Sequence, residues 1–79
     1  MPFIQIQTVE GILDDTQRKD LLTRITDLVV EIEGRGDPAF RSSVWVTLDE
    51  RRPSQWSLGG MLPTAEMIAE RFPARVAAS

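Results

Sequence analysis

Apolar and polar residues alternate in two short stretches of this 79-residue chain, residues 3–9 and residues 43–49. A period of two residues is typical of β-strands that bury one face. In the first stretch Ile4 and Ile6 fall on one face with Thr8. In the second, Val44, Val46 and Leu48 share a face, and Trp45 and Thr47 share the other. The pattern therefore predicts two strands.

Between these strands, apolar residues recur with helical spacing at Leu21, Leu22, Ile25, Leu28, Val29 and Ile32. Such a stripe predicts an amphipathic helix over about residues 15–33. Asp14 and Gln17 have the spacing of an N-terminal capping box. Gly34 stands where a left-handed residue often follows a helix. The polar face, which includes Arg18, is expected to lie in solvent.

The order strand, helix, strand predicts an α/β protein with a β-α-β fold. Its strands should be parallel, because a long connection joins them, and the crossover should be right-handed. One helix covers only one face of such a sheet, whereas parallel sheets are normally covered on both. The uncovered face is therefore expected to pack on another subunit.

The remaining chain predicts smaller elements. Residues 50–55 read as a polar turn, and residues 56–60 as a short hairpin or arm ending in Gly59-Gly60. Residues 63–72 read as a second helix, begun by Pro63 or Thr64 and stopped by Pro73. The last residues, 74–79, are expected to fray.

Composition limits the possible chemistry. The chain has no cysteine and no histidine, which excludes disulfides, zinc sites built from these residues and Ser-His or Cys-His nucleophiles. A single domain of this size buries a marginal core, so oligomerisation is the expected source of extra stability. The domain is read as a core of residues 2–60 with an arm and helix over residues 61–79. No metal or organic cofactor is implied.

Charge and hydropathy limit the partners and the location of the protein. The net charge is −3, and a main partner made of nucleic acid would call for a basic patch. No apolar run approaches the ~20 residues of a membrane-spanning helix, and no signal peptide is recognisable. A cytoplasmic protein that acts on a small molecule, with neither nucleic acid nor membrane as partner, is expected.

Pro2 is the candidate for chemistry. A small second residue favours removal of Met1, which would leave a free secondary amine at the start of the first strand. Such an amine is both a base and a nucleophile, and burial and nearby charge set its protonation. If Met1 is retained, the nitrogen of Pro2 is an amide and cannot act as a base.

Several features occur together in an order that is similar to the 4-oxalocrotonate tautomerase family of the tautomerase superfamily. They are Pro2, a first strand with Gln5 and Gln7, the Glu10-Gly11 turn, a capped helix, the strand Ser43-Val44-Trp45-Val46, and the arm Trp56-Ser57-Leu58-Gly59-Gly60. The resemblance covers roughly residues 2–60. It implies a β-α-β fold that dimerises through a shared four-stranded sheet, and Pro2 as general base.

The resemblance also implies a hexamer built as three dimers, which the Gly59-Gly60 arm favours. The chain after Met61 is an extension that could block hexamer contacts and leave a dimer.

The chain departs from this family at its carboxylate-binding arginines. The resemblance leads us to expect these arginines at the positions of Ile12 and Trp45. Trp56 matches the family's aromatic residue near the arm. Ile12, Trp45 and Trp56 are therefore expected to line an apolar substrate pocket. Arg41 or Arg52 is expected to supply a relocated cation, with Arg51 as a further possibility. Ordinary surface positions for these arginines, and subunit packing for Trp45, remain open.

Three functions are compatible with these residues. The first is keto–enol tautomerisation of a small 2-oxo or enol acid, or of an aromatic enol such as phenylpyruvate, with Pro2 as general base. The second is hydration or dehalogenation, with protonated Pro2 as general acid and Glu10, Asp49 or Glu50 as partner carboxylate. The third is a non-catalytic assembly module of the same fold.

Overall fold

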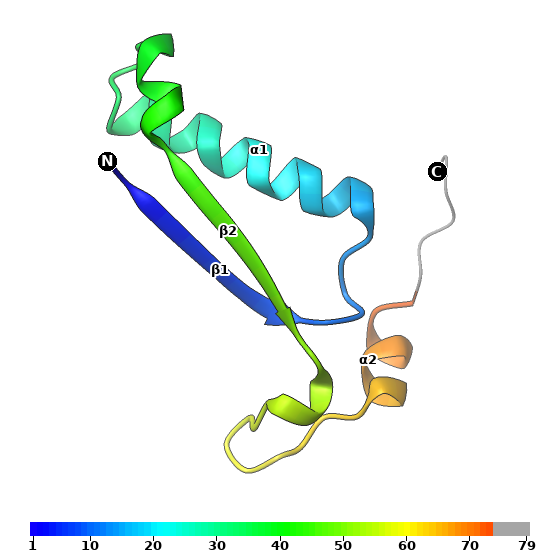
Figure 1. Ribbon diagram of the computed structural model, residues 1–79. Helices are drawn as coiled ribbons and strands as arrows, with labels where there is room; N and C mark the ends of the chain where they lie inside the picture. The colour runs from blue at the N-terminus through cyan, green and yellow to red at the C-terminus, as the bar shows by residue number, and fades with distance from the viewer. Residues whose placement is uncertain (74–79) are drawn as a thin grey trace.

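Two strands and a long helix form one β-α-β unit in the computed structural model, which describes residues 1–73 (Figure 1). Strand β1 (Phe3–Val9) and strand β2 (Trp45–Arg51) lie side by side and parallel, and helix α1 (Asp15–Ile32) connects them. Their register pairs Phe3 with Trp45 and Val9 with Arg51. The predicted parallel β-α-β arrangement is confirmed.

Helix α1 covers one face of the sheet and leaves the other bare (Figure 1). The covered face carries half-buried side chains, namely Ile4, Ile6, Val46 and Leu48. An ion pair between Arg18 of α1 and Glu50 of β2 identifies it as the helix side. The opposite face exposes Phe3 and Trp45 among polar residues. The alternation along each strand therefore buries one face of the sheet and exposes the other, as predicted.

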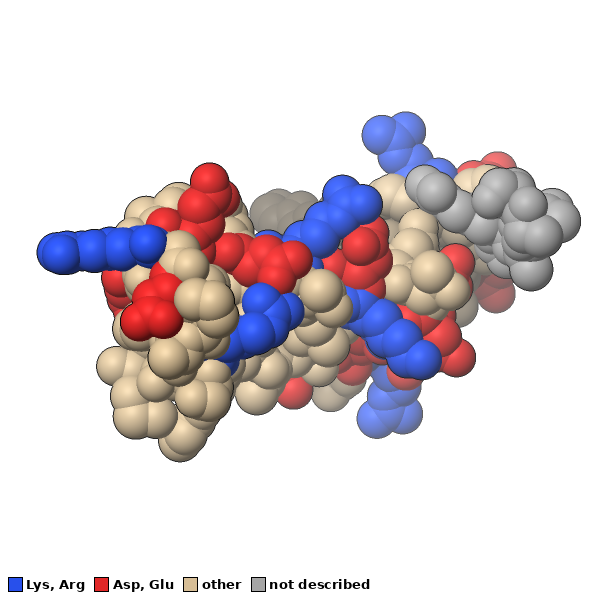
Figure 2. All heavy atoms as spheres, turned by 90° about the horizontal axis from the view of Figure 1, so that it is seen from above, with Lys and Arg blue, Asp and Glu red and all other residues tan. Residues whose placement is uncertain are grey.

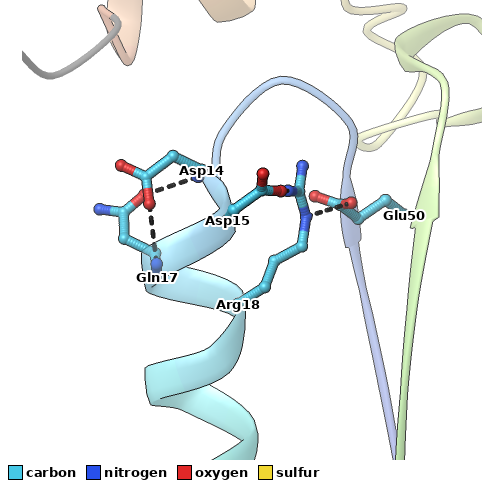
Figure 3. A network of polar contacts seen from close by, with 5 residues as sticks. All are labelled: Asp14, Asp15, Gln17, Arg18 and Glu50. Atoms are coloured by element: carbon cyan, nitrogen blue, oxygen red, sulfur yellow. Dashed lines mark hydrogen bonds and ion pairs between the residues drawn. The ribbon is translucent and has the colours of Figure 1, made fainter. Parts of the chain in front are cut away.

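The start of α1 is fixed by the predicted capping box (Figure 3). The backbone N–H of Gln17 donates to Oδ1 of Asp14 at 2.7 Å, and the N–H of Asp14 donates to Oε1 of Gln17 at 3.0 Å. The expectation that Arg18 lies in solvent is wrong. Its Nε donates to Oε2 of Glu50 at 2.7 Å, because the first turn of α1 passes over the end of β2.

The prediction for Gly34 is also wrong. Arg35 and Gly36, with φ of 54° and 78°, adopt the left-handed conformation at the end of α1, and Gly34 does not. Gly34 is instead a packing position: a Cβ there would lie 2.6 Å from Cδ2 of Phe40. The absence of a side chain lets the following segment return closely against the helix.

Strand β2 begins two residues later and ends two residues later than the predicted residues 43–49. A 3₁₀ helix, η1 (Pro38–Ser43), takes up Ser43, and Asp37 caps it by accepting from the N–H of Ala39. At the other end, β2 continues because β1 still offers pairing partners as far as Val9. The predicted turn at residues 50–55 shrinks to a second 3₁₀ helix, η2 (Pro53–Gln55).

Helix α2 (Ala65–Arg71) confirms the predicted second helix. Its cap is Thr64, whose Oγ1 accepts from the N–H of Met67 at 3.2 Å. A bridge between Leu58 and Met61 closes the predicted tight turn, in which Gly59 and Gly60 both have positive φ. The predicted fraying concerns residues 74–79, which lie outside the described residues.

The apolar core of residues 1–73 is small. Val30 and Val44 are buried, with 9% and 8% of their surface exposed, and Pro53 and Pro63 are buried as well. Large apolar side chains remain outside, including Phe3 at 60% and Trp45 at 57% exposure. No helix between Met1 and Pro73 is long and apolar enough to cross a membrane.

Candidate functional site

The predicted site residues fall at opposite ends of the sheet formed by β1 and β2. Pro2 and Trp45 lie where the two strands begin, whereas Ile12, Arg52 and Trp56 follow the points where the strands end. A seven-residue strand rises about 3.3 Å per residue, which separates the two groups by roughly 20 Å. One copy of the chain therefore does not bring them together.

Pro2 and Trp45 are neighbours at the amino end of the sheet. The backbone N–H of Trp45 donates to the carbonyl oxygen of Pro2 at 3.1 Å, which fixes the half-buried proline against β2. The indole Nε1–H of Trp45 donates to the carbonyl oxygen of Ser42 at 3.2 Å. The backbone of Trp45 thus lies beside Pro2, while its exposed indole belongs to the bare face of the sheet.

Arg41 is close in sequence but is turned toward α1. Its Nη1 donates to Oδ1 of Asp27 at 2.6 Å, so the guanidinium joins η1 to the helix. Met1 is 79% exposed and precedes Pro2, whose nitrogen is an amide in this 79-residue chain. A basic amine at this position thus requires removal of Met1.

At the carboxyl end of the sheet, the carbonyl oxygen of Arg51 joins two segments. It accepts from the N–H of Glu10 at 2.8 Å and from the indole Nε1–H of Trp56 at 3.3 Å. The Glu10-Gly11 turn and the chain after η2 are therefore held side by side. Arg52 donates through its backbone N–H to Oε1 of Gln55, and its guanidinium has no ion-pair partner within residues 1–73.

A cavity of about 720 Å³ opens beside Ile12, between the turn after β1 and the end of α2. Its lining residues are Gly11, Ile12, Leu13, Asp14, Gln17, Arg71, Phe72 and Pro73. Arg52 and Trp56 do not line it. Arg71 was not among the arginines expected from the sequence, because only the packing of α2 against the Glu10-Gly11 turn brings it here.

An ion-pair network fixes the α1 side of this end of the sheet (Figure 3). Arg18 reaches both Asp15 and Glu50, and its hydrogen bond with Glu50 raises the pKa of the guanidinium above its ordinary value. The second carboxylate oxygen of Glu50, Oε1, is buried without a hydrogen-bond partner. The ion pair through Oε2 is thus the contact by which Glu50 connects β2 to α1.

The charges seen in Figure 2 are interspersed, with basic side chains standing between acidic ones and no continuous basic stripe on that face. No group of three or more His, Cys, Asp or Glu side chains within residues 1–73 is arranged to hold a metal ion.

Comparisons with known proteins agree on one family. The family model described as tautomerase enzyme matches residues 2–66. The chain is 34% identical over 61 residues to a probable tautomerase of Listeria innocua, which covers 77% of this chain and 92% of the relative.

Two solved structures share the fold. A 4-oxalocrotonate tautomerase homologue superimposes with a TM-score of 0.66 at 29% identity, covering 78% of this chain and 90% of its own. A structure from a study of 4-oxalocrotonate tautomerase isozymes from Methylibium petroleiphilum gives 0.65 at 25% identity, covering 85% and 97%.

Proposed function

Because the chain belongs to the tautomerase family, we propose that it is a keto–enol tautomerase in which Pro2, freed by removal of Met1, is the general base. The observation that carries the proposal is the place of Pro2. It stands at the start of β1, half-buried and held through its carbonyl oxygen by Trp45, while Met1 before it is exposed. Removing Met1 leaves this hydrogen bond intact.

The reaction needs one base and no redox partner. The Pro2 amine takes a proton from the carbon next to a carbonyl, which leaves an enolate. The protonated amine then returns this proton to the enolate oxygen, so that the product is the enol and the neutral amine is restored; the reverse path gives the ketone. An unperturbed α-amino group has a pKa of roughly 8. Partial burial of Pro2 at the start of β1 favours the neutral amine, which is the form that accepts the proton.

A second copy of the chain would complete the site. Two-fold symmetry about an axis perpendicular to the sheet makes equivalent edge strands pair antiparallel. The Pro2 end of one copy would then lie near the Ile12 end of its partner. This pairing gives a four-stranded sheet, and the exposed Phe3 and Trp45 would contribute apolar surface to further contacts, as in the expected hexamer.

Hydration or dehalogenation is supported less well, because two of its candidate carboxylates are occupied. Glu50 is paired with Arg18 on the covered face of the sheet, and Oδ2 of Asp49 accepts from Nε2 of Gln5 at 3.2 Å. A non-catalytic role would not require a free amine at Pro2.

The test compares intact mass and activity. We expect protein from its natural source to lack Met1 and to tautomerise phenylpyruvate. Pro2→Ala should lower kcat/KM by about 10²-fold or more, the usual contribution of a general base. Pro38→Ala, which changes the first residue of η1, is the matched control and should retain activity. Retained Met1, or full activity of Pro2→Ala, would remove the proposal.

A further inference from the structure

We propose that Arg71 makes the cavity beside Ile12 a binding site for small monocarboxylates with an apolar body. This inference rests on the proposed function and deepens it, because it names the class of acid that the tautomerase would accept. It also assigns a role to helix α2, most of which follows the residues 2–66 that match the family model.

Helix α2 is positioned so that Arg71 reaches the cavity. Ile68 packs against the turn after β1 so closely that a Cβ on Gly11 would lie 3.3 Å from Cγ2 of Ile68. Arg71 follows Ile68 by three residues and therefore lies on the same face of the helix. Thr64 caps the start of α2, which helps to hold this short helix in place.

Arg71 is the basic side chain of the cavity lining and is available to a ligand. No ion pair joins it to another side chain within residues 1–73. A guanidinium offers five N–H donors in a planar arrangement that matches a carboxylate. The start of α1 is not an alternative anion site, because Asp14 and Gln17 already cap it and Asp14 is itself negative.

The walls indicate what the rest of the ligand looks like. Ile12, Leu13, Phe72 and Pro73 contribute apolar surface, and the volume of about 720 Å³ lies within the range of about 300–1,000 Å³ found for small-molecule sites. A second carboxylate would find apolar walls and Asp14 instead of another cation. One carboxylate on an aliphatic or aromatic body is therefore the best match.

A second cavity, of about 580 Å³, adjoins α2 and also includes Arg71. Its lining contains Glu70 as well, together with apolar side chains such as Met67 and Leu58. Each cavity contains one acidic side chain. The carboxylate of Asp14 already accepts the backbone N–H of Gln17, whereas the side chain of Glu70 has no hydrogen bond or ion pair within residues 1–73, so the cavity at Ile12 is the better site for the acid.

The probe for this site is 3-phenylpropionate, an unreactive acid, with 3-phenylpropanamide as its uncharged counterpart. Both are titrated into the full-length ¹⁵N-labelled protein and followed by NMR. We expect the acid to shift the amide signals of Gly11, Ile12 and Leu13 and to bind more tightly than the amide. Arg71→Gln should weaken binding of the acid by about tenfold, the low end for a charge-assisted hydrogen bond.

Two further variants make the test specific. Arg24→Gln removes an equally charged side chain from the exposed surface of α1 and should leave binding unchanged. Asp14→Asn keeps a residue that caps helices well but removes the negative charge from the lining, so it should tighten binding about twofold. Equal binding by Arg71→Gln and Arg24→Gln, or equal binding of acid and amide, would overturn the proposal.

The outcome is separable from that of the proposed function. If the acid binds through Arg71 but Pro2→Ala turns over phenylpyruvate as fast as the original chain, the carboxylate site stands and the tautomerase proposal fails. If phenylpyruvate turnover depends on Pro2 while Arg71→Gln leaves KM unchanged, the tautomerase stands and this inference fails. When both hold, Arg71→Gln raises KM with little change in kcat.

Discussion

Adding one methyl group at Gly34 should destabilise the protein, because the space is already occupied. A Cβ there would lie 2.6, 2.7 and 2.8 Å from Cδ2, Cγ and Cβ of Phe40. Carbon atoms pack best at about 3.5–4.0 Å, so η1 would have to move away from α1 by roughly half an ångström or more. Rotating the ring of Phe40 does not solve the problem, since its Cβ is fixed to the backbone.

The size of the effect follows from two opposing terms. Overpacking costs about 1–3 kcal/mol, whereas replacing glycine by alanine gains about 0.4–1 kcal/mol by restricting the unfolded chain. We therefore expect Gly34→Ala to reduce the free energy of unfolding by about 1–2 kcal/mol. For a domain of this size the Tm should fall by about 5–15 °C.

Thermal and denaturant unfolding followed by circular dichroism measure the change. Every variant is compared at the same protomer concentration, because assembly makes Tm depend on concentration. Glu33→Ala is the control. It also places an alanine at the end of α1, but at an exposed position, and should change stability little. In the Phe40→Ala background, Gly34→Ala should cost less, since two of its three close contacts are then absent.

A Gly34→Ala variant as stable as the original chain would contradict the packing argument. So would a cost that is the same with and without the ring of Phe40. The contact matters for the proposed site as well, because η1 leads into Trp45, whose backbone N–H donates to Pro2, and its Ser42 accepts from the indole of Trp45.

Two further predictions concern the start of α1. Asp14→Ala removes the capping box and should reduce the free energy of unfolding by about 1 kcal/mol, whereas Asp14→Asn should retain most of that stability. Unfolding in urea measures both variants, and an equal loss of stability in both would contradict a capping role. Arg18→Gln should lower the Tm, because it leaves Glu50 without its partner. The hydrogen bond with Glu50 raises the pKa of Arg18 in the folded protein, so its contribution is lost only as the pH rises through that raised value, far above neutrality. The fall in Tm should therefore be the same at pH 7 and pH 9, and a difference that shrinks at pH 9 would show that another group is responsible.

Local patterns in the sequence determined the elements of this fold. The two-residue period defines which side chains of β1 and β2 face α1, and the apolar stripe and the pair Asp14 and Gln17 define the helix. These signals are reliable because they depend on residues a few positions apart. The order of the elements then requires parallel strands, since a long connection joins them.

The tertiary structure decided features that depend on residues distant in sequence. Gly34 resembles a helix-ending glycine, yet its role is set by the ring of Phe40. Arg18 looks like a surface residue of α1, but the crossover places it over Glu50. The boundaries of β2 shifted because pairing with β1, and not the composition of residues 43–49, determines where the ladder begins and ends.

The candidate site shows the same division. Pro2 is a candidate from the sequence alone, because a free amine there requires only its place after Met1. The position of Arg71 does not, since it requires α2 to fold back so that Ile68 meets Gly11, a contact between residues 57 positions apart. The sequence thus determined the local elements and the candidate base. Only the three-dimensional packing decided which arginine stands beside Ile12, because that depends on how separate elements come together.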